Sequence, residues 1–172
     1  MIFVTVGTHE QPFNRLVKAV DDLKADGTIP ASESVFIQTG FSTYEPQHCE
    51  WIRLLPYEDM QRYIHEARIV ITHGGPSSFL APLQLGKIPI VMPRRAEYGE
   101  HVNDHQMEFV KDVAERFGNI LVTNNKSELA EAINNYNRLS VEMNGSKPTS
   151  NNQAFCEQLE RIIEQLVSRR SI

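Results

Sequence analysis

Residues 69–78 read IVITHGGPSS, and this stretch decides the fold. A short apolar run passes into two glycines, and a proline follows at a position where a helix can begin. A fully apolar run of this length is typical of a strand buried on both faces of a parallel sheet. The stretch therefore predicts a buried strand, a glycine turn and a helix that begins at Pro76.

Similar apolar runs recur along the chain, and segments with helical periodicity lie between most of them. The clearest helical pattern spans residues 13–23, where apolar residues repeat with a period near 3.6. This alternation predicts an α/β fold, a Rossmann-like doubly wound parallel sheet. The other expected strands are Ile2–Val6, Val35–Ile37, Trp51–Leu55, Ile88–Met92 and Ile120–Val122.

Three further positions predict the starts of helices. Pro12 suits the first position of a helix, where proline is tolerated best. Asn125 with Glu128, and Asn103 with Gln106, have the spacing of a capping box, in which two side chains bond to the backbone of the first turn.

Length and patterning predict one domain followed by a tail. The chain has 172 residues, which suits a single α/β domain, placed here at residues 1–142. The polar, turn-rich residues 143–153 predict a linker or loop. Residues 154–172 predict an amphipathic helix, because apolar residues recur at helical spacing from Phe155 to Val167. This helix either packs on its own domain or crosses to a partner.

Charge and hydropathy argue against several partners and locations. The formal net charge is -5 and charges of both signs are scattered, so the chain lacks the basic stripe that nucleic acid requires. No stretch approaches the roughly 20 apolar residues of a membrane-spanning helix. Residues 1–6 have the pattern of a strand rather than of a signal peptide. We expect a cytoplasmic chain that contacts a membrane only through another protein.

Ligands of an open parallel sheet bind beyond the carboxyl ends of its strands, where two loops stand out, Gly7–Gln11 and His73–Ser78. The second loop has the chemistry of an anion site. Its glycines allow close approach of a ligand, and free amides of Ser77 and Ser78 would lie at the positive end of a helix dipole. A diphosphate would fit there; the alternative is an ordinary glycine turn before a helix.

The loop after the first expected strand lacks the G-x-G-x-x-G pattern, which argues against a nicotinamide or flavin cofactor. Gly7 and Thr8 could still contact phosphate. His9 would lie at the mouth of the strand, where an imidazole can act as a general base near neutral pH. A solvated surface histidine is the alternative reading.

A third region, residues 93–106, is more polar and longer than a simple connection needs. At its end Asn103, His105 and Gln106 offer the donors and acceptors that recognise sugar hydroxyls, although the sequence favours Asn103 as the cap of a helix. A metal is not expected from His73, His101 and His105. Only the last two are four residues apart, and His101 precedes the helix expected after Asn103, so the three do not form a helix-borne pair of zinc ligands.

Several of these segments together resemble the donor-binding, C-terminal domain of family 28 glycosyltransferases. They occur in order as Ile71–Phe79, Leu85–Pro89 and Asn103–Gln106, and the resemblance covers residues 1 to about 140. With the opening Val4–Thr8, the chain looks closest to a short, single-domain branch from bacterial capsule and exopolysaccharide biosynthesis. That branch is similar to the catalytic subunit of the eukaryotic two-subunit dolichol-linked N-acetylglucosaminyltransferase.

The resemblance implies one half of a GT-B glycosyltransferase that is inverting, independent of metal and without a cofactor. A UDP-sugar is its donor substrate, and galactose is our first expectation for the hexose. The acceptor is a lipid-diphosphate-linked saccharide, and a membrane-associated subunit supplies the acceptor domain at the inner face of the membrane. Homo-oligomerisation stays open. The alternatives are a non-catalytic nucleotide-sugar-binding or activating subunit and, less well supported by length, an epimerase.

The resemblance also assigns residues. The general base is His9 or a residue of the partner. Many family members have a glutamate for the ribose where this chain has Ala81, so ribose recognition is expected to differ or to be weaker, and Arg94 or Glu100 is a candidate substitute. The donor-binding residues implied are Gly7, Thr8, His73, Gly74, Gly75, Pro76, Ser77, Ser78, His105 and Gln106, and Asn103 is added from its place in the third region.

Overall fold

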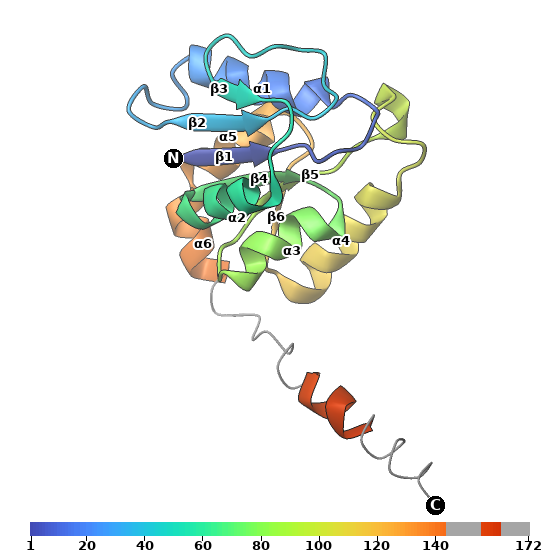
Figure 1. Ribbon diagram of the computed structural model, residues 1–172. Coiled ribbons are helices and arrows are strands. Elements are labelled where there is room, and N and C mark those ends of the chain that lie inside the picture. Colours follow the sequence, from blue (N-terminus) through green and yellow to red (C-terminus); the bar gives the residue numbers. More distant parts are fainter. Residues whose placement is uncertain (144–155, 163–172) are drawn as a thin grey trace, which may run out of the picture.

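The computed structural model describes residues 1–143 and 156–162, and it confirms the Rossmann-like parallel sheet (Figure 1). All six described strands pair in parallel in the order β3-β2-β1-β4-β5-β6. The order reverses between β1 and β4, which makes this the switch point where a crevice opens at the carboxyl edge. The strands are β1 (Ile2–Thr5), β2 (Val35–Gln38), β3 (Glu50–Ile52), β4 (Ile69–His73), β5 (Ile90–Met92) and β6 (Leu121–Val122).

Helices cover both faces of this sheet. On one face α1 (Asn14–Ala25) packs against α5 (Lys126–Asn134), and α6 (Tyr136–Met143) follows α5. On the other face lie α2 (Tyr57–Glu66), α3 (Pro76–Gln84) and α4 (His105–Phe117). A short 3-10 helix, η1 (Ala96–Tyr98), stands in the loop after β5.

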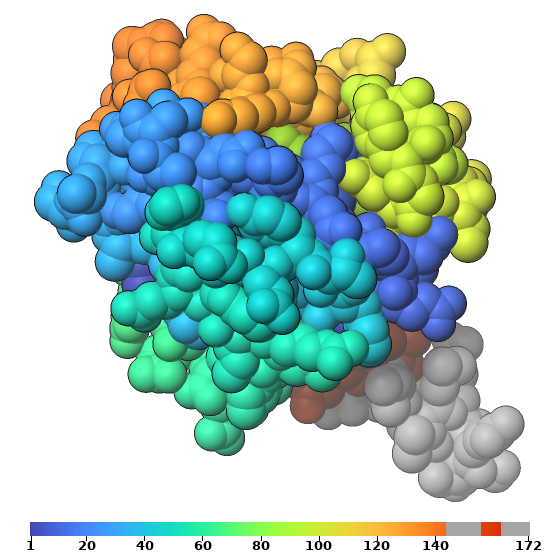
Figure 2. Space-filling model, turned by 90° about the horizontal axis from the view of Figure 1, so that it is seen from above, coloured from blue at the N-terminus to red at the C-terminus, as the bar shows by residue number. Residues whose placement is uncertain are grey.

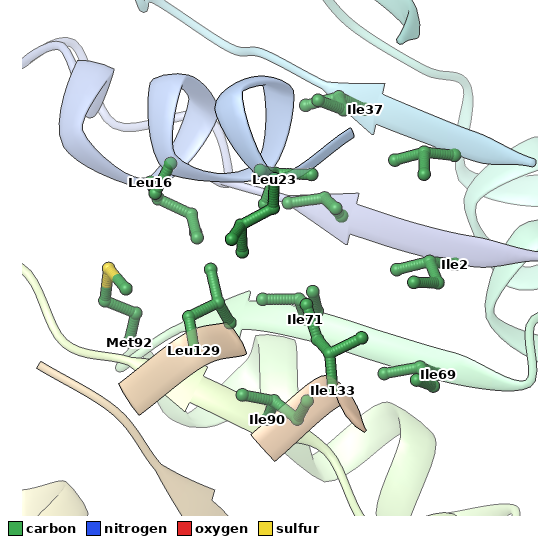
Figure 3. Close-up of a cluster of buried hydrophobic side chains, with 14 of the residues drawn as sticks. Ile2, Leu16, Leu23, Ile37, Ile69, Ile71, Ile90, Met92, Leu129 and Ile133 are labelled. Atoms are coloured by element: carbon green, nitrogen blue, oxygen red, sulfur yellow. The ribbon is translucent and has the colours of Figure 1, made fainter. Parts of the chain in front are cut away.

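The core between α1, α5 and the sheet is built from aliphatic side chains that alternate along the strands (Figure 3). Leu16 and Leu23 of α1 and Leu129 of α5 are almost completely buried there. A fully buried leucine stabilises a fold by about 1.5–3 kcal/mol relative to an exposed one. The strand residues in between, such as Phe3, point to the other face of the sheet. There the rings of Phe3 and of Tyr63 in α2 stack with their centroids 5.4 Å apart.

Of the four expected helix starts, those at Pro76 and Asn125 are confirmed, and those at Pro12 and Asn103 are wrong. α3 begins at Pro76, and the Asn125 side chain accepts a hydrogen bond of 2.9 Å from the amide of Glu128. α1 begins at Asn14 rather than at Pro12. The reason is Phe13, which is fully buried in a non-helical conformation and donates its amide to the Ser42 hydroxyl.

The edges of the domain and the tail differ from the expectations in detail. β3 is shorter than expected and its residues are exposed, because only β2 pairs with it. Of the expected terminal helix, residues 156–162 are helical and exposed, whereas the linker beyond Met143 lies outside the described residues. In the described part of the chain, no helix is long and apolar enough to cross a bilayer.

Candidate functional site

A cleft of about 470 Å³ lies at the carboxyl edge of the sheet, at the switch point between β1 and β4. Its walls come from the loop after β1, the end of β4, the first turns of α3 and one face of α2. Six of the residues expected from the sequence meet there. The lining residues are Thr5, Gly7, Thr8, His9, Tyr57, Met60, Gln61, Ile64, His73, Ser77, Ser78 and Ala81.

His73 organises the loop after β4 with both ring nitrogens. Its Nδ1 accepts the Gly75 amide at 3.0 Å, and its Nε2 lies 2.6 Å from the Ser78 hydroxyl oxygen. Burial lowers the pKa of His73 to about 4, and the charge of Arg94 adds to the effect. The ring is therefore neutral near pH 7. Because Nδ1 accepts a hydrogen bond, the proton resides on Nε2 and is donated to Ser78.

This arrangement leaves the Ser78 hydroxyl as a donor toward the cleft. Its oxygen already accepts the Nε2 proton of His73, so its own proton must go to another acceptor. Ser78 lines the cleft at the start of α3, where the helix dipole favours a negative charge. A phosphate oxygen is an acceptor of the right kind.

Most backbone amides of this loop are already used, which corrects the expectation that Ser77 and Ser78 both present free amides. The Ser78 amide donates to the Gly75 carbonyl at 3.0 Å. The Gly74 amide donates to the Gln106 side chain, and the Gly75 amide to His73. Among the described residues, only the Ser77 amide of this loop has no such partner.

Three glycines are required around His73 by close packing. A Cβ atom on Gly75 would lie 2.3 Å from Cε1 of His73, and one on Gly7 would lie 2.6 Å from Nε2 of the same ring. Gly7 also has a φ of 75°, which disfavours side chains. A Cβ on Gly40 would lie 2.5 Å from the Gly7 carbonyl oxygen. The loop after β2 therefore packs on the backbone of the loop after β1, and Gly7 of that loop packs against the ring of His73 at the end of β4.

Gln38 at the end of β2 holds the loop after β1, a role that we did not infer from the sequence. Its Oε1 accepts from the Thr5 hydroxyl at 2.7 Å and from the Gly7 amide at 3.2 Å. Its Nε2 donates to the carbonyls of Gly7 and Arg53 at 3.0 Å. A buried glutamine at the carboxyl end of an apolar strand is the signal that could have found it.

The expected capping box of Asn103 and Gln106 is wrong, and Gln106 has another role. Asp104 is the residue that precedes α4. The Gln106 Oε1 instead accepts the amides of Gly74, at 3.1 Å, and of Arg94, at 3.2 Å. Gln106 thus joins the loop after β4 to the loop after β5. Gln106 is not among the residues that line the cleft, so its contact with the donor sugar stays a prediction.

Asn103 and His105 are not among the residues that line the cleft. The Asn103 side chain accepts the His105 amide at 3.3 Å, which organises the turn before α4. The His105 side chain is 79% exposed and lies 3.9 Å from the Glu108 carboxylate. Their role in sugar recognition stays a prediction.

Arg94 and Glu100 cannot take over ribose binding, because both are buried and bonded within the protein. Arg94 donates to the carbonyls of Val6, Gln11 and Glu100 at 2.8–2.9 Å. The Glu100 carboxylate receives two hydrogen bonds from Arg15, at 2.9 and 2.8 Å. The expectation that either residue substitutes for the missing glutamate is therefore wrong.

His9 lies at the mouth of the cleft beside His101, with ring centroids 4.8 Å apart. His9 belongs to the loop after β1 and His101 to the loop after β5. In Figure 2 these two segments adjoin, the first in blue and the second in yellow-green. Burial, together with the charges of Arg94 and His101, lowers the pKa of His9. Its Nδ1 accepts the Gln11 amide at 3.2 Å, so the neutral ring carries its proton on Nε2.

The wall formed by α2 was not anticipated from the sequence. Tyr57, Met60, Gln61 and Ile64 face the cleft, and Tyr57 is 77% exposed. Their spacing of i, i+3, i+4 and i+7 places them on one helical face, which is the signal that could have found them. An aromatic ring and a thioether at this position offer a flat apolar surface to a ligand.

Comparison with known proteins places this architecture in a family. The model of the glycosyltransferase family 28 C-terminal domain matches residues 1–166. None of the curated proteins matches the chain in sequence.

Solved structures share the fold at low sequence identity. The glycotransferase of kitacinnamycin has a TM-score of 0.59 and 14% identity over 85% of this chain. MurG of Acinetobacter baumannii has a TM-score of 0.57 and 18% identity over 91% of this chain. The matches span 38% and 48% of those two proteins, so this chain covers less than half of each. The expected GT-B half-fold is thereby confirmed.

Proposed function

This chain belongs to the glycosyltransferase family 28 C-terminal domains, and from that premise we propose that its cleft binds the UDP-sugar donor of a glycosyl transfer. The observation that carries the proposal is the cleft itself. At one switch point it brings together the loop after β1, the Ser78 hydroxyl at the start of α3 and the apolar face of α2. The diphosphate would lie at Ser77 and Ser78, and the nucleoside would lie against Tyr57 and Met60.

The transfer inverts the configuration at the anomeric carbon. The oxygen of an acceptor hydroxyl forms the new bond to that carbon, while the bond from the carbon to the phosphate oxygen breaks and its electron pair leaves with UDP. The hydroxyl proton passes to a base on the face opposite the diphosphate. The N-terminus of α3 and the Ser78 hydroxyl stabilise the charge that develops on the leaving group.

Two candidates for the base follow from the geometry around His9. His9 lies at the cleft mouth and is neutral, as a base must be. Its Nδ1 lone pair, however, accepts the Gln11 amide, so it becomes available only when that hydrogen bond opens. This contact favours the second candidate, a base on the acceptor domain. In that arrangement this chain binds the donor and stabilises the leaving group, while the acceptor domain removes the proton.

The finer assignment follows the resemblance noted in the sequence. We propose a hexose donor, with galactose first, and a lipid-diphosphate-linked saccharide of capsule or exopolysaccharide biosynthesis as acceptor. A membrane-associated subunit supplies the acceptor domain and holds the complex at the inner face of the membrane. The exposed Leu159 and Ile162 of the tail helix offer it an apolar contact.

Calorimetry with a chelator tests the donor site. We expect UDP to bind the purified chain equally well with and without EDTA, because hydroxyl and amide donors together with a helix dipole replace a metal. Uridine is the control, and it should bind more weakly. Binding that disappears with EDTA and returns with magnesium or manganese would contradict the metal-free site.

A reconstitution assay tests whether transfer requires the acceptor-domain subunit. We expect little transfer to a lipid-linked saccharide by the chain alone, and product when the membrane-associated acceptor-domain subunit is added. Removal of residues 154–172 should reduce co-purification with that subunit more than UDP binding. Full transfer by the isolated chain, or loss of the folded domain on truncation, would refute this arrangement. Slow hydrolysis of the donor by the chain alone would place the base on His9.

A further inference from the structure

We propose that Arg94 is the fixed cation of the donor site, which attracts the diphosphate from beneath the loops without touching it. The inference rests on the proposed function and deepens it, because it names the charge that takes the place of a metal. In this role Arg94 is a positioning residue, and it acts through the three loops that it joins.

The described part of the cleft lacks a cation of its own. None of its lining residues is lysine or arginine, and its two histidines are neutral near pH 7. The N-terminus of α3 offers less than usual, since the amides of Gly74, Gly75 and Ser78 already have partners. A doubly charged diphosphate therefore needs positive charge from the surroundings of the cleft.

Arg94 stands directly behind these loops and is fully buried. Its guanidinium donates to the carbonyls of Val6 and Gln11, which flank the loop after β1, and to that of Glu100. Its backbone amide shares the Gln106 oxygen with the Gly74 amide, which ties it to the loop after β4. One residue thus joins the segments that form the cleft.

The charge of Arg94 is bound by carbonyl dipoles rather than cancelled by a carboxylate. The charge of Glu100 does act on Arg94, whose pKa it raises against the effect of burial. The Glu100 carboxylate, however, receives its hydrogen bonds from Arg15 and from the Arg95 amide, so its negative charge is paired mainly with Arg15. Burial lowers the pKa of Arg94 only to about 10, so the guanidinium stays charged at neutral pH. A buried charge acts over several ångströms with little screening by solvent.

The charge of Arg94 lowers the pKa of two neighbouring histidines. Arg94 is the largest charged contributor to the lowered pKa of both His9 and His73, after burial. The other groups that face His9 are His101 and Glu10; those that face His73 are Gln106, His9 and His101. A potential that repels protons from two imidazoles at the cleft attracts a phosphate to the same place.

Substitutions that separate charge from packing test the proposal. The full-length chain carrying Arg94→Met or Arg94→Lys is titrated calorimetrically with UDP and with uridine. We expect Arg94→Met to lower the ratio of the two affinities about tenfold, and Arg94→Lys to change it by less than about threefold, because lysine keeps the charge. Arg95→Met is the matched control, since the half-buried Arg95 side chain pairs with the exposed Glu97 and does not line the cleft, so its loss should leave the ratio unchanged.

Two further measurements give a readout that a purely structural role would not move. In NMR titrations, Arg94→Met should raise the pKa of His73, whereas Arg94→Lys should leave it low. In the wild type, the affinity ratio should fall by less than about threefold between 0.05 and 0.5 M salt, because a buried cation is poorly screened. A large loss of the ratio in salt would overturn the proposal even when Arg94→Met does not fold.

The outcomes distinguish the two proposals. Two results overturn the role of Arg94 and leave the donor site standing, provided that the wild type binds UDP. One is an unchanged ratio of the affinities for UDP and uridine in Arg94→Met. The other is a tenfold fall of that ratio in the wild type when salt is added. Failure of the folded wild type to bind UDP overturns both. An equal loss of the ratio in the methionine and lysine variants assigns Arg94 to packing alone, which also overturns its role as the cation.

Discussion

Gly75→Val should abolish UDP binding and destabilise the domain by about 3 kcal/mol or more. The backbone of Gly75, with φ of -74°, suits any residue, so conformation is not the reason. The reason is that its Cβ would lie 2.3 Å from the ring of His73. The ring must leave its place, and it then loses its hydrogen bonds to the Gly75 amide and to Ser78. Thermal melting and calorimetry with UDP measure the two effects.

Two variants sharpen this experiment. Gly74→Ala is the matched control, because its Cβ would meet the side chains of Gln106 and Val110 at 3.0 Å, where a shift of a few tenths of an ångström relieves the contact. The double variant His73→Ala with Gly75→Val should be no less stable than His73→Ala alone, because the clash partner is gone. Additive losses in this cycle, or wild-type binding by Gly75→Val, would refute the packing argument.

Gln106→Ala should lower the free energy of unfolding by about 2–4 kcal/mol, because two buried backbone donors lose their acceptor. These donors are the amides of Gly74 and Arg94, one from each loop beside the cleft. The affinity for UDP should fall together with stability, since both loops position the site. Chemical denaturation monitored by circular dichroism gives the first quantity, and calorimetry gives the second.

Gln106→Glu separates loop support from sugar recognition. A carboxylate keeps the acceptor for both amides but loses the Nε2 donor that we expect to meet the sugar. This variant should remain stable, while its ratio of affinities for UDP-sugar and UDP falls toward one. If both variants keep the stability of the wild type, the bridge to Gly74 and Arg94 contributes little. If the ratio is unchanged in Gln106→Glu, the sugar lies elsewhere.

The layout of the fold could be predicted from local pattern because each element carries its own signal. Apolar runs with turn residues at their ends identified all six strands, and Pro76 marked the start of α3. Strand ends were less certain, since β1 ends at Thr5 and β5 begins at Ile90. Parallel pairing then brought the loops after β1 and β4 to one edge, so part of the cleft followed from topology alone.

Partners far apart in the sequence could not be predicted in the same way. Asn103 and Gln106 have capping-box spacing, and local rules assign such a pair to the backbone of their own helix. In the fold, the Gln106 oxygen instead accepts the amides of Gly74 and Arg94, which belong to the loops after two neighbouring strands. Arg94 and Glu100 were misread as ligands for the same reason, since burial is a property of the assembled sheet.

The parallel α/β fold, the edge of the sheet at which the cleft lies and the glycine loop from His73 to Ser78 all followed from the sequence. Periodicity and turn chemistry act within a few residues, so they can be read directly. Only the tertiary structure decided which groups of that edge stay available to a ligand. Three loops compete there for the same few donors and acceptors, and contacts between residues as distant as Val6 and Arg94 settle the outcome.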